Sequence, residues 1–140
     1  MDYTISFTNK PSLEEIDALC NGLEKHAKKI IGRTSFHPFG YLVHDDEERL
    51  IAGCTGVIMY GFLHIKLLWV EEGARNKGLG KQLMEKAESY AKESNCQYII
   101  LETFDFQAKH FYEKLGYTIT LVYEGFENDI QFYYFRKKIN

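Results

Sequence analysis

The sequence predicts a mixed α/β domain, with a central, mostly antiparallel sheet of about seven strands flanked by three or four helices. Strand-length apolar segments alternate with segments whose apolar residues recur at helical spacing. Three successive strand-like segments between residues 40 and 70 are joined by short turns, as in an antiparallel meander. The chain has 140 residues, the usual size of one domain. We therefore expect a single domain over residues 1–140.

The N-terminal region is predicted to form a strand and then a helix. Residues 3–8 alternate apolar and polar side chains, which is typical of a half-buried strand. Ser12, with Glu15 three positions later, forms a capping-box pattern at a helix start. Apolar residues follow at helical spacing up to Gly32, where we expect the helix to end.

The middle of the chain is predicted to form the meander. Its strands are expected over residues 40–44, 50–60 and 62–70, with a polar turn after the first of them. Gly53 and Gly56 interrupt the second strand, and we expect them to mark bulges or close contacts.

The C-terminal half is predicted to begin with an amphipathic helix that starts directly after the loop at residues 75–80. The strand over residues 97–103 contains a continuous apolar run, which predicts burial on both faces. A short helix over residues 107–115 follows. Two strands, over residues 117–123 and 130–137, complete the predicted elements.

Composition narrows the classes of partner. The net charge of -3 lacks the basic surplus of nucleic-acid-binding proteins, so we expect no nucleic-acid partner. The longest apolar runs have strand length and no signal-peptide pattern is visible, so we expect no membrane partner and a cytoplasmic location. Cys20, Cys54 and Cys96 show no metal-ligand spacing, so we expect buried, reduced thiols and no metal site.

The loop over residues 75–81 has the features of a phosphate site. It follows an apolar strand and opens into a helix, so it presents backbone N–H groups together with the positive helix end. Two nucleotide motifs do not fit. Leu83 stands where the dinucleotide fingerprint needs its third glycine, and Leu79 stands where the nucleoside-triphosphate loop needs lysine. A plain turn that starts a helix is the alternative for the loop taken alone.

Two segments carry a resemblance to a known family. Residues 75–80, Arg-x-x-Gly-x-Gly between a strand and a helix, resemble the acetyl-CoA signature of the GNAT superfamily of N-acetyltransferases, Gln/Arg-x-x-Gly-x-Gly/Ala. Residues 108–117, AKHFYEKLGY, are similar to that family's Ala-x-x-Phe-Tyr-x-x-x-Gly-Phe/Tyr segment. The resemblance implies a GNAT-like fold, acetyl-CoA as co-substrate and acetyl transfer to a primary amine.

The same resemblance implies how acetyl-CoA would bind. Backbone amides of residues 76–81 would hold the pyrophosphate, while Arg75 and Lys77 either add charge or are simply solvated. The strand before the loop would splay from its neighbour at a bulge, so that its main chain pairs with the pantetheine arm and polarises the thioester carbonyl. Asp105 stands where many members carry a CoA-contacting asparagine. The implied cofactor-binding residues are Leu68, Trp69, Val70, Arg75, Asn76, Lys77, Gly78, Leu79, Gly80, Lys81 and Asp105.

Two residues are candidates for catalysis. Tyr112 matches the family's tyrosine that protonates the leaving thiolate, since a phenol keeps its proton at neutral pH; packing is the alternative. Glu102 follows four apolar residues in a strand, which makes it the best candidate base; an ion pair with a lysine or arginine is the alternative. Asp105, His110 and His64 are weaker candidates. Neither motif contains a cysteine, so direct transfer is favoured.

The sequence indicates less about the acceptor than about the cofactor. The last two strands are rich in aromatic residues, which either pack in the core, line the acceptor cleft or form a dimer contact. A small-molecule amine is favoured as the partner, and a homodimer is left open. The alternatives are a protein or peptide amine as acceptor, or a noncatalytic CoA-binding sensor or interaction module.

Overall fold

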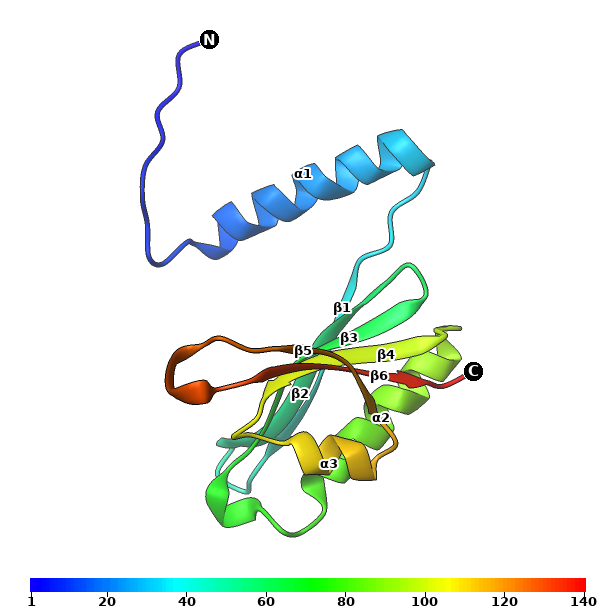
Figure 1. The fold of residues 1–140 in the computed structure, drawn as a ribbon. Coiled ribbons are helices and arrows are strands. Elements are labelled where there is room, and N and C mark those ends of the chain that lie inside the picture. Colours follow the sequence, from blue (N-terminus) through cyan, green and yellow to red (C-terminus); the bar gives the residue numbers. More distant parts are fainter. The chain divides into compact units, whose positions relative to one another are not determined.

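The computed structural model describes all 140 residues and divides into two compact units, residues 1–35 and residues 36–140. Figure 1 shows the elements along the chain. They are α1 (Leu13–Ile31), β1 (His37–His44), β2 (Leu50–Met59), β3 (Phe62–Val70), η1 (Glu72–Ala74), α2 (Leu79–Glu93), β4 (Tyr98–Phe104), α3 (Lys109–Lys114), β5 (Thr118–Tyr123), η2 (Glu127–Asp129) and β6 (Phe132–Lys138). None of the helices is long and apolar enough to cross a membrane.

The N-terminal unit consists of an extended segment and α1. The predicted capping box is confirmed, with the Glu15 N–H donating to Ser12 Oγ at 3.1 Å and the Ser12 N–H to Glu15 Oε1 at 2.9 Å. Gly32 ends the helix in the left-handed conformation, as predicted. The prediction of a strand over residues 3–8 is wrong. Alternating apolar residues indicate one apolar face, but a strand also needs a neighbouring strand to pair with its backbone N–H and C=O groups. The absence of the predicted strand leaves six strands where about seven were expected.

The second unit is built on one six-stranded sheet with the order β1-β2-β3-β4-β6-β5. All neighbouring strands are antiparallel except β3 and β4, which are parallel. The mixed, mostly antiparallel sheet is therefore confirmed. The parallel ladder is short, and pairs only Phe62–His64 with Tyr98–Ile100.

Both glycines predicted to mark irregularities in β2 do so. Opposite Thr55 and Gly56 the register of β3 slips by one residue, so that Lys66 forms a bulge. A Cβ on Gly56 would lie 2.2 Å from the His64 carbonyl oxygen, so no larger residue fits there. A Cβ on Gly53 would meet Leu42 Cδ2 at 3.0 Å.

The core lies between the sheet and α2 (Figure 1). Helix α2 buries Leu83, Met84, Ala87 and Ala91 against the strands, and Tyr112 of α3 joins the same cluster. The prediction that both faces of β4 are buried is wrong for one face. Ile99 and Leu101 are buried, whereas Tyr98 and Ile100 stay partly exposed.

The cysteines partly match their prediction. All three are free thiols. Cys54 and Cys96 are buried as expected, but Cys20 on α1 is only partly buried.

Candidate functional site

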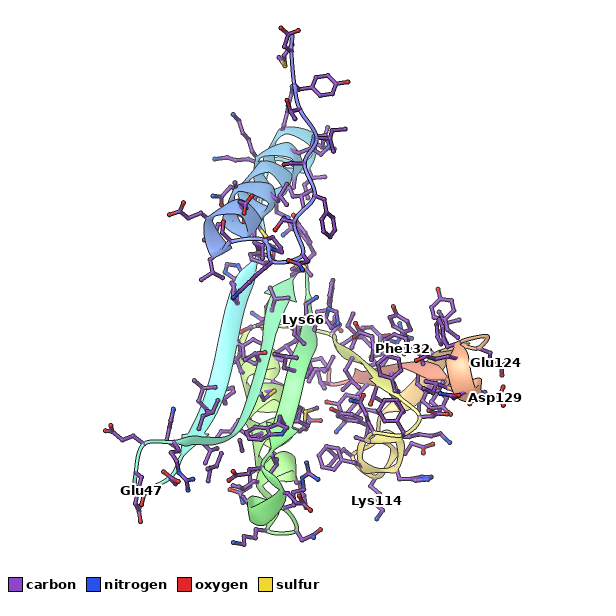
Figure 2. The ribbon with its side chains drawn as sticks, turned by 90° about the vertical axis from the view of Figure 1, so that its left-hand side faces the viewer. Glu47, Lys66, Lys114, Glu124, Asp129 and Phe132 are labelled. Carbon is purple, nitrogen blue, oxygen red and sulfur yellow. The ribbon has the colours of Figure 1, made fainter.

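A cleft opens where β3 and β4 separate. The two strands pair no further than His64 and Ile100, and the bulge at Lys66 turns the rest of β3 away from β4 (Figure 2). The splay expected from the resemblance is therefore present. The cleft has a volume of about 170 Å³. Its lining residues are Ile65, Lys66, Leu67, Leu68, Leu101, Glu102, Thr103, Gln107, Ala108 and Tyr112.

Helix α2 starts without a side-chain cap. Gly78 occupies the N-cap position with a φ of 79°, and the preceding Asn76 also has a positive φ, of 63°. The first helical hydrogen bond runs from the Gln82 N–H to the Gly78 carbonyl at 3.0 Å. The N–H groups of residues 79–81 precede that bond and receive no side-chain cap, and the first turn contains no acidic residue. This start can therefore donate hydrogen bonds to an anion.

Gly80 has a packing role in addition to the one expected. A Cβ at this position would lie 3.2 Å from Phe111 Cζ and 3.9 Å from Val70 Cγ2. The missing side chain thus lets α2 approach α3 and the end of β3 closely. Gly78 differs, because its positive φ rather than a neighbour is what favours glycine.

A larger cavity of about 640 Å³ lies at this helix start. It brings together most of the residues implied for the cofactor. Those in its lining are Leu68, Trp69, Val70, Arg75, Asn76, Gly78, Leu79, Gly80 and Lys81. Lys77 and Asp105 were also implied, but neither belongs to the lining.

Four further residues complete this lining: Phe106, Gln107, Ala108 and Phe111. Ala108 and Phe111 lie within the second motif, so its apolar positions could have indicated them. Gln107 accepts hydrogen bonds from Thr103 Oγ1 and the Phe104 N–H, both at 3.2 Å, which fixes its side chain between the cleft and the cavity. Nothing in the local sequence distinguishes Phe106 or Gln107 from other loop residues.

The basic residues of the loop have different surroundings. Arg75 Nε donates to the Val70 carbonyl at 2.9 Å, which ties the guanidinium to the end of β3. Lys81 forms an exposed pair with Glu85 at 4.0 Å, which contributes little to stability.

Tyr112 is almost fully buried and lines the cleft. Its ring contacts Phe111, Tyr117 and Phe135, with centroid distances between 5.1 and 5.9 Å. Burial raises the pKa of the Tyr112 hydroxyl well above its ordinary value, with a smaller contribution from Cys54. The hydroxyl therefore holds its proton at neutral pH and can donate it.

Glu102 lies in the same cleft and is held by a histidine. Its Oε2 lies 2.5 Å from Nε2 of His64, whose side chain is 13% exposed. The expected alternative was an ion pair with a lysine or arginine, and the structure shows His64 in that place. Of the weaker candidates, His110 is largely exposed and lies 3.4 Å from Glu113. Asp105 is exposed, and its N–H donates to the Gln131 carbonyl.

Comparisons with known proteins identify the family of the chain. The model of the acetyltransferase (GNAT) family matches residues 10–117. Blasticidin-S acetyltransferase from Streptomyces morookaense is 44% identical over 75 residues, which cover 53% of this chain and 55% of that protein. The chain thus matches only about half the length of this curated relative.

Solved structures share the fold. A protein from Agrobacterium tumefaciens assigned as an acetyltransferase is 21% identical and superposes with a TM-score of 0.84 over 99% of both chains. A Bacillus anthracis protein assigned as a streptothricin acetyltransferase, solved in complex with acetyl-CoA, is 25% identical, with a TM-score of 0.66 over 74% of this chain and 64% of that one. The fold expected from the resemblance is therefore confirmed.

Proposed function

Because the chain belongs to the GNAT family of acetyltransferases, we propose that it transfers an acetyl group from acetyl-CoA directly to a primary amine of a small molecule. One observation carries the proposal. The cavity at the start of α2 and the cleft between β3 and β4 adjoin each other, because their linings share Leu68, Gln107 and Ala108. A cofactor held at the helix start would therefore extend toward Tyr112 and Glu102.

The residues of the cavity fit acetyl-CoA. The N–H groups of residues 79–81 would bind the pyrophosphate, with Lys81 adding positive charge in the lining. The edge of β3 that faces β4 beyond His64 has no strand partner, so the main chain of Leu68, Trp69 and Val70 can pair with the pantetheine arm. Contributions from Lys77 and Asp105 stay predictions.

The reaction needs two proton movements. Acetyl-CoA supplies an activated thioester; the amine nitrogen bonds to its carbonyl carbon as the carbon–sulfur bond breaks. Glu102 takes the proton that the amine loses, and His64 holds the Glu102 carboxylate in place. The Tyr112 hydroxyl gives its proton to the departing sulfur. A backbone N–H of residues 68–70 polarises the carbonyl.

Further properties belong to the same proposal. The names of two relatives, blasticidin-S acetyltransferase and streptothricin acetyltransferase, support a small molecule as acceptor. We propose that residues 1–140 act as one acetyltransferase domain. The three free thiols support a reducing compartment such as the cytoplasm. A homodimer stays a prediction.

Calorimetry followed by an acetylation screen tests the proposal. The full chain is titrated with acetyl-CoA and then incubated with a library of small amines and of lysine peptides. We expect submicromolar to micromolar binding and turnover of small amines. Turnover of peptides alone would replace the acceptor class, binding without any turnover would indicate a noncatalytic module, and absence of binding would refute the cofactor.

The variant Tyr112→Phe separates chemistry from binding. Removal of the hydroxyl should lower kcat by about a hundredfold or more while acetyl-CoA affinity stays within about twofold, because the phenol acts on the leaving sulfur. The control is Tyr123→Phe, which removes an exposed hydroxyl outside both hollows. Unchanged kcat in Tyr112→Phe would remove this residue from the mechanism.

A further inference from the structure

A third hollow, of about 530 Å³, adjoins the proposed cofactor cavity. We call it the aromatic pocket. Figure 2 labels Phe132, which belongs to it, and also Glu124 and Asp129 at the tip of the hairpin between β5 and β6. The pocket is lined by Phe104, Phe106, Phe126, Glu127, Ile130 and Phe132.

The rings of the aromatic pocket have a defined arrangement. Phe104 and Phe106 stack with a centroid distance of 5.4 Å and an interplanar angle of 7°. Phe104 also contacts Phe132 at 4.8 Å, because these residues face each other in the β4–β6 ladder. Phe106 and Phe126 are nevertheless 65% and 48% exposed. Exposed aromatic side chains gathered in one hollow are a sign of a binding surface.

The turn that carries Phe126 and Glu127 is internally bonded. Asn128 and Asp129 both have positive φ, of 54° and 58°, in the 3-10 turn that follows Phe126. The Ile130 N–H donates to the Glu127 carbonyl at 3.1 Å. Such backbone angles in non-glycine residues persist where a turn is held in one conformation.

The aromatic pocket adjoins the proposed cofactor cavity. Phe106 lines both of them. Phe104 also follows Glu102 by two residues on β4, so the two side chains lie on the same face of the sheet. A molecule in the pocket can therefore extend an amine toward the cleft.

We propose that the aromatic pocket binds the body of the acceptor, and that this acceptor is an amine attached to a planar aromatic or heteroaromatic ring. The inference rests on the proposed function and adds the substrate class. Four phenylalanines offer ring faces for stacking, and Glu127 is the one charged residue in the lining. Glu127 favours a second, cationic substituent over an anionic one.

Size and polarity support a small ring compound over a peptide. A volume of about 530 Å³ lies in the range of small-molecule sites. Five of the six lining side chains carry no hydrogen-bonding group, so the N–H and C=O groups of a peptide would find few partners there.

A pair of matched amines tests the ring requirement. Phenethylamine and cyclohexylethylamine have the same reach and a single amine each, but only phenethylamine has a planar ring. In the presence of saturating CoA, we expect phenethylamine to bind at least about fivefold more tightly, as measured by ligand-observed NMR titration. In the acetylation assay its kcat/KM should be higher by a similar factor.

Variants locate that preference in the pocket. Phe126→Ala should weaken phenethylamine binding about tenfold and leave acetyl-CoA affinity unchanged, because Phe126 lines the aromatic pocket but not the cofactor cavity. Tyr123→Ala, an equally exposed aromatic on the same hairpin and outside the pocket, is the matched control. Glu127→Gln should reduce the preference for a para-aminomethyl over a para-carboxylate derivative of phenethylamine.

The outcomes separate this inference from the proposed function. Absence of acetyl-CoA binding would refute the function. Acetylation of amines with no ring preference, or a preference that survives in Phe126→Ala, would refute the aromatic pocket alone. Ring-selective binding without acetylation of any ring amine would show that the pocket does not serve the acceptor. An equal loss of phenethylamine affinity in Phe126→Ala and Tyr123→Ala would show a general effect on the hairpin and would also refute the aromatic pocket.

Discussion

Two helices of this chain begin in opposite ways. Helix α1 starts with Ser12, whose hydroxyl accepts from the Glu15 N–H, and its first turn carries Glu14 and Glu15. Helix α2 starts at Gly78, with no side-chain cap and no acid in its first turn. Glycine in place of a capping residue costs only about a few tenths of a kcal/mol, so the open start of α2 weakens the helix slightly. The chain satisfies one helix start with its own atoms and leaves the other available to an external anion.

The largest expected effect comes from placing a negative charge at the open start. Gly78→Asp should weaken acetyl-CoA binding by about a hundredfold, because the carboxylate would repel the pyrophosphate. The left-handed φ of 79° keeps the new side chain from capping in the usual extended geometry. Calorimetric titration with acetyl-CoA measures the change.

Gly78→Asn is the matched control, because asparagine has the same size and tolerates the left-handed region without adding charge. It should lose only a fewfold in affinity. Equal losses in both variants would mean that the backbone conformation at position 78, and not the charge at the start of α2, governs binding.

A smaller effect is expected from Gly80→Ala. The added methyl would lie 3.2 Å from Phe111 Cζ, so α2 and α3 must move apart slightly. We expect acetyl-CoA affinity to fall about tenfold and the free energy of unfolding to fall by about 1–2 kcal/mol. Both are measurable, by calorimetry and by urea denaturation.

Gly73→Ala provides the comparison for this variant. A Cβ at Gly73 would have no heavy atom within 4 Å, and its φ is not in the left-handed region. Affinity and stability should both stay near the wild-type values. If Gly80→Ala behaves like Gly73→Ala, the close contact between α2 and α3 does not shape the cavity.

Removal of the Ser12 cap should affect the stability of α1 alone. Ser12→Ala removes the acceptor for the Glu15 N–H and should destabilise the first turn by about 1 kcal/mol. Amide hydrogen exchange within Leu13–Ile31 should then be about fivefold faster, while acetyl-CoA affinity is unchanged. A loss of acetyl-CoA affinity in Ser12→Ala would contradict the view that only α2 has a ligand-binding start.

The difference between these helix starts could be predicted from the sequence, because capping is local. Ser12 and Glu15 are three residues apart, and the glycines of the loop precede the helix directly. The same is true of the bulge next to Gly56, where a glycine marks a close backbone approach. The strand predicted over residues 3–8 failed for the converse reason, since a strand depends on a partner that local alternation cannot provide.

The parts of the site that the sequence could not predict are set by strand register. His64 and Glu102 are 38 residues apart, and only the short parallel ladder between β3 and β4 brings them together. Phe104 and Phe132 meet through the register of β4 against β6. The sequence could indicate that the last strands are rich in aromatic residues, but not which rings would line a pocket.

The smallest expected effect distinguishes two lysines of the loop. Lys81 lines the cavity at the open start of α2, whereas Lys77 does not. Lys81→Gln should therefore weaken acetyl-CoA binding about threefold, and Lys77→Gln by less than about twofold. The Lys81 contribution should shrink as the salt concentration rises from 50 to about 500 mM, because an exposed charge is screened within a few ångströms at high ionic strength. Titrations of both variants at the two salt concentrations measure this. Equal effects from the two lysines would show that positive charge acts at long range around the loop. Direct binding of the anion at the start of α2 would then depend on the backbone N–H groups alone.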